Sequence, residues 1–217
     1  MKVLPACLEI EEGLINHKLA YSELPEGYQL KNKFDLSENL TAKILLSLIS
    51  LVLFFLFLLF FIWILQVLRP GHVDFDTAFS LFGEVRFFPD QIIILLVLTF
   101  LMVFLHEGIH GLFFWIFSKE KPKFGFKLVY AFAGAPGWYF AKWPYMVIGI
   151  SPLILITIIG FLFLIFVPAG WILPIVLFIT LNAGGAAGDI YTVFWLLPKP
   201  RNTLVHDSGE RVKVFGN

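Results

Sequence analysis

The sequence is poor in charged residues, which make up 15% of its 217 residues, against about 25% in an average soluble domain. It has one cysteine, Cys7, which excludes an intramolecular disulfide and any metal site built from several cysteines. The net charge is zero, so no basic field points to a nucleic-acid partner. What is abundant is apolar: 59% of the residues are hydrophobic and the mean hydropathy is +0.84. An apolar content this high indicates that much of the chain is surrounded by something other than water.

Long uncharged runs identify that solvent as a lipid bilayer. Residues 44–68 carry no charge, and about 20 apolar residues are enough to cross a membrane. The uncharged run 143–188 is long enough for two crossings, which "VPAG" at 167–170 separates. Together with a further apolar segment, these runs predict four transmembrane helices, near 43–68, 91–117, 144–167 and 170–197.

The predicted helices divide the chain into three parts. One loop between them, 118–143, is unusually rich in apolar residues. We expect an N-terminal segment at 1–42, an all-α transmembrane domain at 43–197 and a tail at 198–217. The loop 118–143 carries β-branched and aromatic residues on either side of "GAPG", which predicts a β-hairpin over 124–142. Such a hairpin would offer an edge strand to an extended peptide. The alternative is an interfacial loop that only anchors the protein.

The basic residues predict the orientation in the membrane. Five lie in 1–43, five in 118–143 and four in 198–217, against two in 69–90. Cytoplasmic loops of membrane proteins carry the excess of Lys and Arg. The sequence therefore predicts an integral, multi-pass protein of the cell membrane with both termini in the cytoplasm.

The stretch "HEGIH" places three ionisable side chains inside the second apolar segment. His106 and His110 are four residues apart and so share one face of a helix, where two imidazoles can bind one zinc ion. Glu107 lies beside them, as in HExxH enzymes, in which zinc acidifies a water and the glutamate acts as general base. Ionisable groups within a membrane are costly and mark functional sites. The pattern thus predicts a zinc centre.

A catalytic zinc normally has a third protein ligand, and Asp189 is the candidate within another membrane segment. Glu107 is the 17th residue from Gln91 and Asp189 the 20th from Gly170, so their depths differ by only about 4–5 Å. Asp189 could instead hold a histidine N–H as an outer partner. The competing third ligands, all outside the predicted membrane segments, are His72, Glu120 and His206.

Small residues surround Asp189 on the same predicted helix. Asn182 precedes it by seven residues and so falls on the same helical face. The "AGGAAG" between them allows close approach of another helix or of an extended peptide, although ordinary tight packing would also explain it.

The pair of motifs "HEGIH" and "NAGGAAGD" resembles the small membrane proteins called putative zincin peptidases, and more distantly site-2 proteases, which cut substrates within the membrane. The resemblance implies one zinc ion held by His106, His110 and Asp189, with Glu107 as catalytic base. Asn182 is assigned to substrate positioning. Site-2 proteases carry a proline soon after this asparagine and an Asp-Gly pair, whereas here no such proline follows and the order is Gly188-Asp189.

The sequence therefore predicts a membrane-embedded zinc metalloprotease that hydrolyses peptide bonds in or near the bilayer. Its substrate would be a membrane protein or peptide. The alternative from another class is a non-enzymatic membrane protein that binds zinc as a sensor, scaffold or carrier. Replacing Glu107 by Gln separates the two, because it spares both histidines and removes the base.

Overall fold

The computed structural model describes residues 19–35, 39–71, 89–126, 131–209 and 211–217. It is mostly helical, with short antiparallel strands, and its internal contacts divide it into two units. The first unit, called the sheet unit, contains Met1–Asn39, His110–Gly149 and Thr192–Asn217. The second, called the helical unit, contains Leu40–Ile109 and Ile150–Tyr191.

The long helices coincide with the uncharged runs. They are α2 (Leu40–Leu68), α4 (Pro89–Ser118) and α5 (Lys142–Phe166). After a 3₁₀ turn, η1 (Ala169–Trp171), come α6 (Ile172–Gly185) and α7 (Ala187–Leu196), which bend by 42° at a short break. Among the residues that the structure describes, three helices are therefore apolar and long enough to cross a membrane, or four if α6 and α7 form one span. This is compatible with a multi-pass membrane protein.

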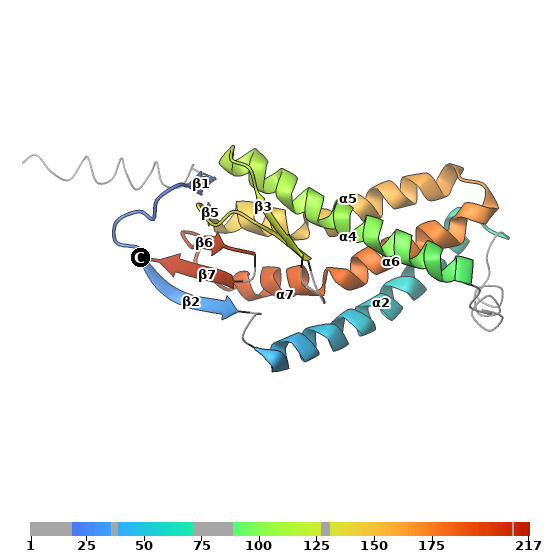
Figure 1. Ribbon diagram of the computed structural model, residues 1–217, viewed down its shortest axis with the longest axis horizontal. Coiled ribbons are helices and arrows are strands. Elements are labelled where there is room, and N and C mark those ends of the chain that lie inside the picture. Colours follow the sequence, from blue (N-terminus) through green and yellow to red (C-terminus); the bar gives the residue numbers. More distant parts are fainter. Residues whose placement is uncertain (1–18, 36–38, 72–88, 127–130, 210) are drawn as a thin grey trace, which may run out of the picture. The chain divides into compact units, whose positions relative to one another are not determined.

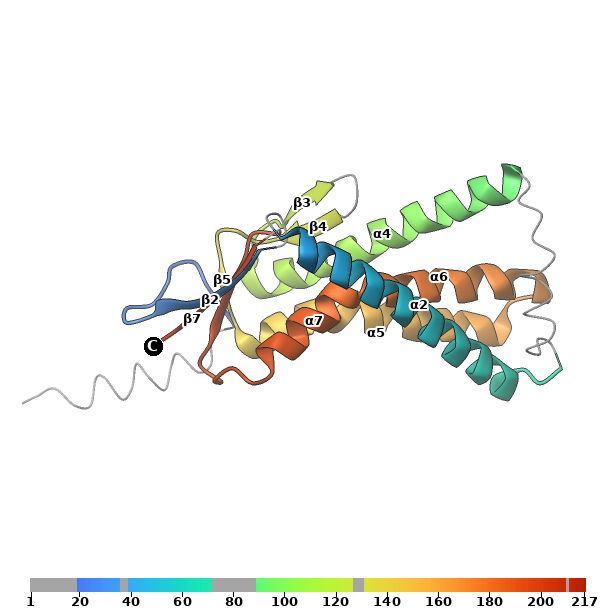
Figure 2. The same ribbon diagram turned by 90° about the horizontal axis from the view of Figure 1, so that it is seen from below.

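Within the helical unit, α2 packs against α6, and the two run side by side in Figures 1 and 2. Gly184 makes this approach possible, since a Cβ there would lie 3.1 Å from the Cβ of Phe54. The Ser50 hydroxyl donates to the Gly184 carbonyl across the interface at 2.8 Å. This part of "AGGAAG" thus serves tight helix packing.

The sheet unit corrects the all-α prediction. Its five-stranded antiparallel sheet has the order β1-β5-β6-β7-β2 (Figure 1). The strands are β1 (Ala20–Tyr21), β2 (Gln29–Asp35), β5 (Tyr139–Ala141), β6 (Leu204–Asp207) and β7 (Arg211–Gly216). They come from the N-terminal segment, the loop before α5 and the C-terminal tail. Strands of two to seven residues are too short to carry a clear alternation in the sequence.

The predicted hairpin exists, but its position was wrong. Antiparallel β3 (Lys123–Phe126) and β4 (Ala131–Gly134) form it, so "GAPG" follows the hairpin rather than making its turn. The strand after "GAPG", β5, pairs with β1 on one side and β6 on the other. The reason is burial, because Phe140 of β5 is fully buried in the core of the sheet unit. An inner strand of this kind offers no edge to a peptide.

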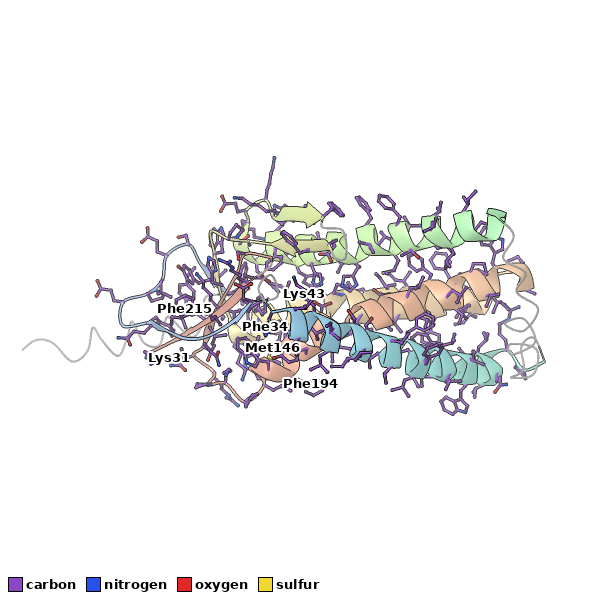
Figure 3. The ribbon with its side chains drawn as sticks, turned by 60° about the horizontal axis from the view of Figure 1, so that its bottom comes forward. Lys31, Phe34, Lys43, Met146, Phe194 and Phe215 are labelled. Atoms are coloured by element: carbon purple, nitrogen blue, oxygen red, sulfur yellow. The ribbon has the colours of Figure 1, made fainter. Side chains whose placement is uncertain are left out.

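Aromatic side chains fill the core of the sheet unit. Phe114 and Phe140 meet edge to face with ring centroids 5.2 Å apart, a favoured arrangement of aromatic pairs. Val205 and Val214, on the paired strands β6 and β7, are buried in the same cluster. At the outer strand, Asp35 and Arg211 form an ion pair at 2.6 Å. Figure 3 labels Lys31 and Phe34 on β2 and Phe215 on β7.

Candidate metal centre

Both histidines of "HEGIH" point into the protein. His106 is 7% exposed and His110 is 8% exposed, whereas their neighbour Phe104 is 59% exposed. Helix α4 thus presents apolar side chains outward and its imidazoles inward. This arrangement removes the cost of placing polar groups against lipid.

His106 is held from two helical segments of the helical unit. Its Nδ1 lies 2.9 Å from Oδ1 of Asn182, near the end of α6, and its Nε2 lies 3.0 Å from Oδ2 of Asp189, in the first turn of α7. Asn182 is fully buried, and its Nδ2 donates to the Pro152 carbonyl at 3.3 Å, which fixes the orientation of the amide. Because Oδ1 only accepts, the proton of His106 is assigned to Nδ1, and Nε2 faces the carboxylate.

The same reasoning applies to His110 within the sheet unit. Its Nδ1 lies 2.9 Å from the Ile148 carbonyl oxygen. A carbonyl oxygen can only accept, so His110 also carries its proton on Nδ1. Nε2 is then the basic nitrogen, as a metal ligand requires. Both histidines are therefore oriented in the same way, each by an acceptor at Nδ1.

His106, His110 and Asp189 form a group that could hold a metal ion, with one ligand atom from each within 4.8 Å of the others. His110 follows His106 by one turn of the continuous helix α4, and Asp189 contacts His106 directly. Zinc bonds to N and O of about 2.0–2.2 Å place tetrahedral ligand atoms roughly 3.3–3.5 Å apart. The observed 3.0 Å between His106 and Asp189 needs only a small opening. These residues fit one zinc ion.

The competing ligands are engaged elsewhere. His206 lies with Nε2 2.9 Å from the Pro136 carbonyl oxygen, and Glu120 accepts a hydrogen bond from Trp138 Nε1 at 2.5 Å. Neither belongs to a potential metal group in the described part of the chain. His72 lies outside the described residues.

Glu107 and Asn182 complete the set of predicted site residues. Glu107 follows His106 on α4 and is half-buried. Asn182 contacts His106, so its expected part in substrate positioning stays a prediction. Sequence reasoning did not anticipate the carbonyls of Ile148 and Pro152. The available signal was Pro152 itself, a proline inside an apolar helix.

A buried carboxyl group of the sheet unit, Asp207, was also not anticipated. The Tyr145 hydroxyl donates to its Oδ2 and the Gly209 N–H to its Oδ1, both at 2.6 Å. Burial raises the pKa of Asp207, and these hydrogen bonds together with His110 and His206 act in the opposite direction. Its two donors explain how this carboxyl group is tolerated in the interior.

Residues 99–204 match the model of the family described as "Putative zincin peptidase". The matched segment contains His106, Glu107, His110, Asn182 and Asp189. The family description indicates a metallopeptidase that uses zinc. Neither the curated proteins nor the solved structures contain a match to this chain. The more distant likeness to site-2 proteases stays a prediction.

Proposed function

We propose that this protein is a membrane-embedded zinc metallopeptidase that hydrolyses peptide bonds of membrane proteins or peptides in or near the bilayer. The observation that carries the proposal is the group formed by His106, His110 and Asp189. It lies on helices apolar enough to enter a membrane and within the segment that matches the zincin peptidase family.

The residues of the site divide the work of hydrolysis. When bound, zinc supplies Lewis acidity that polarises a carbonyl and lowers the pKa of a water to about 7. The two histidines and Asp189 would hold the ion. The Glu107 carboxylate takes the proton of the attacking water and returns it to the nitrogen of the leaving amine, so it acts first as base and then as acid. Burial of the two histidines keeps bulk water away from their polar contacts.

Strand pairing supports a topology with four crossings. All backbone groups in hydrocarbon must be satisfied within helices or closed barrels, so strands of one small open sheet lie on one side of the bilayer. This sheet joins strands from 20–35, 139–141 and 204–216. An even number of crossings must therefore separate each of these segments from the next. We propose α2 and α4 as the first pair, and α5 with the bent α6–α7 span as the second.

The distribution of Lys and Arg residues assigns the side of the membrane on which the sheet lies. Fourteen of the sixteen Lys and Arg residues lie in or near the three segments that share the sheet. By the positive-inside rule the sheet and both termini are cytoplasmic. The candidate metal centre then lies toward the cytoplasmic ends of α4 and of the α6–α7 span.

A substrate must reach the site with its backbone extended, because a helical peptide bond is already hydrogen-bonded. In the described part of the chain, β3 has β4 as its one strand partner. Phe124 of β3 lies over Gly111, the residue directly after His110. A peptide that pairs with the outer edge of β3 would therefore run beside the last turns of α4.

The test is Glu107→Gln. The variant keeps all three ligands, so it should retain one zinc per chain while hydrolysis falls by about 10²–10⁴-fold, the usual worth of a general base. Membrane proteomics of cells producing wild type or variant identifies the substrate as a protein whose truncated fragment disappears in the variant. Glu120→Gln is the matched control, since this glutamate contacts Trp138 and should leave the fragment unchanged.

The non-enzymatic alternative predicts a different pattern. If His110→Ala, which removes a ligand, changes the cells but Glu107→Gln does not, zinc binding matters and hydrolysis does not. That result would reject the peptidase and favour a zinc sensor, scaffold or carrier.

A further inference from the structure

We propose that Pro152 is the positioning residue of the metal centre, orienting both metal-binding histidines through two carbonyl groups of α5. The inference rests on the zinc site of the proposed function. Its central residues, Ile148 and Pro152, are not among the proposed metal ligands.

The orientation of His110 follows from the backbone N–H that Pro152 lacks. Within a helix, the residue at 152 would donate its N–H to the carbonyl of Ile148, four residues earlier, but proline has no N–H. The donor found at that oxygen is instead Nδ1 of His110, at 2.9 Å. Both groups are buried, with Ile148 only 2% exposed. Pro152 thus leaves a helical carbonyl for an imidazole to use.

The orientation of His106 depends on the carbonyl of Pro152 itself, to which Asn182 is hydrogen-bonded. Nδ2 of Asn182 donates to this oxygen at 3.3 Å, and Oδ1 of the same amide accepts from Nδ1 of His106 at 2.9 Å. Fixing one end of the amide fixes the other, because an amide flipped by 180° would present its donors to His106. One turn of α5, from Ile148 to Pro152, therefore determines the tautomer of both histidines.

This arrangement gives a reason for a proline inside a membrane-type helix. Pro152 is the eleventh residue of a 25-residue helix, where its missing N–H and its ring disfavour helical geometry. Outer partners that hold metal-binding histidines are worth about 10–100-fold in metal affinity. The proline weakens the helix and strengthens the site, so its two effects have opposite signs and can be separated.

The experiment is Pro152→Ala in the full chain, purified in detergent. Alanine restores an N–H that competes with His110 for the Ile148 carbonyl, so zinc affinity, measured by competition with a chromogenic chelator, should fall about 10–100-fold. The melting temperature of the metal-free protein should stay the same or rise, since alanine favours the helix. A purely structural proline would lower affinity and melting temperature together, and that result would overturn the proposal.

Pro174→Ala is the matched control. Pro174 lies in the first turn of α6, where a proline costs no helical hydrogen bond, and its replacement should leave zinc affinity unchanged. Asn182→Leu tests the other arm alone, because it removes the amide and spares the proline. It should also lower zinc affinity about 10–100-fold.

Long-range ¹H–¹⁵N spectra of histidine-labelled protein give a readout independent of activity. In wild type, both His106 and His110 should carry their proton on Nδ1, and in Pro152→Ala the His110 signal should shift toward a mixture of tautomers. Unchanged affinity and unchanged tautomers in Pro152→Ala would overturn the proposal while leaving the peptidase intact. A wild-type protein that binds no zinc would instead reject the proposed function.

Discussion

The long helices of the helical unit and the inner strands of the sheet unit place their large apolar side chains differently. In the helical unit many face outward, with Phe100 71% exposed and Phe166 82% exposed. In the sheet unit the aromatic and aliphatic side chains of the inner strands turn inward, and Phe140 and Val205 are fully buried. The first pattern suits lipid, where outward apolar groups cost nothing. The second suits water, where burying them drives folding.

This difference teaches what holds each unit together. Helices in lipid gain little from burying apolar surface, so they associate through close packing and a few hydrogen bonds. The helical unit accordingly has small residues at its α2–α6 contact and few interior polar groups. Several of these, His106, Asn182 and Asp189, belong to the candidate metal centre. The sheet unit buries polar groups as well, such as Asp207, and it also pairs Asp35 with Arg211 at its outer strand.

Removing a carboxylate should therefore have very different effects in the two units, and this is the largest effect we expect. Asp189→Ala deletes one of three ligands, so zinc affinity should fall by more than about 100-fold, beyond the loss typical of an outer partner. Metal content by mass spectrometry, with circular dichroism to check the helices, measures it. Asp35→Ala, which breaks a surface ion pair, should keep full zinc. Full zinc in Asp189→Ala would mean that the third ligand is another residue.

A truncation in the core of the sheet unit should have the next largest effect. Phe140→Ala leaves a cavity where a fully buried ring was, at a cost of about 3–5 kcal/mol to the free energy of unfolding of this unit. Hydrogen exchange should become fast at β5 and β6 and change little in α2. Phe126→Ala is the control, because this side chain is 63% exposed. Equal exchange in both variants would contradict the assignment of this core.

The smallest effect should come from a hydrogen bond between helices. Ser50→Ala removes the donor to the Gly184 carbonyl, and such contacts in membranes are worth about 0.6 kcal/mol on average. Equilibrium unfolding in mixed micelles measures the change. Ser47→Ala, an exposed position one turn earlier on the same helix, is the matched control. A loss above about 2 kcal/mol would mean that α2 depends on this bond far more than packing suggests.

The contrast between apolar helices and short strands explains which parts of the fold could be predicted from the sequence. Helices in lipid need long apolar runs, so α2, α4 and α5 can be predicted from the sequence. The spacing of His106 and His110 is a local helical property, and matching depth favoured Asp189, which lies with them in a group that could hold a metal ion. These inferences require nothing beyond the geometry of single helices.

The features that the sequence did not reveal depend on distant contacts. The bend between α6 and α7 falls among glycines at 184, 185 and 188, which disfavour a helix without specifying where it breaks. The sheet unites strands nearly two hundred residues apart, and β1 has only two residues. The role of Pro152 depends on which imidazole lies opposite its helical turn, and no local pattern records that.

The order of strands in the sheet also sets an order of events during synthesis. The strand β6 lies between β5 and β7, and β2, made near the start of the chain, pairs with β7, made at its end. Because a chain is made from its N-terminus onward, β2 cannot pair with β7 until the described helices between them have been synthesised. In the topology that we propose, a chain with one helix inserted the wrong way would carry its later strands to the opposite side of the bilayer, where they could not pair with β2. Under that proposal, completion of the sheet would report that the membrane topology is correct.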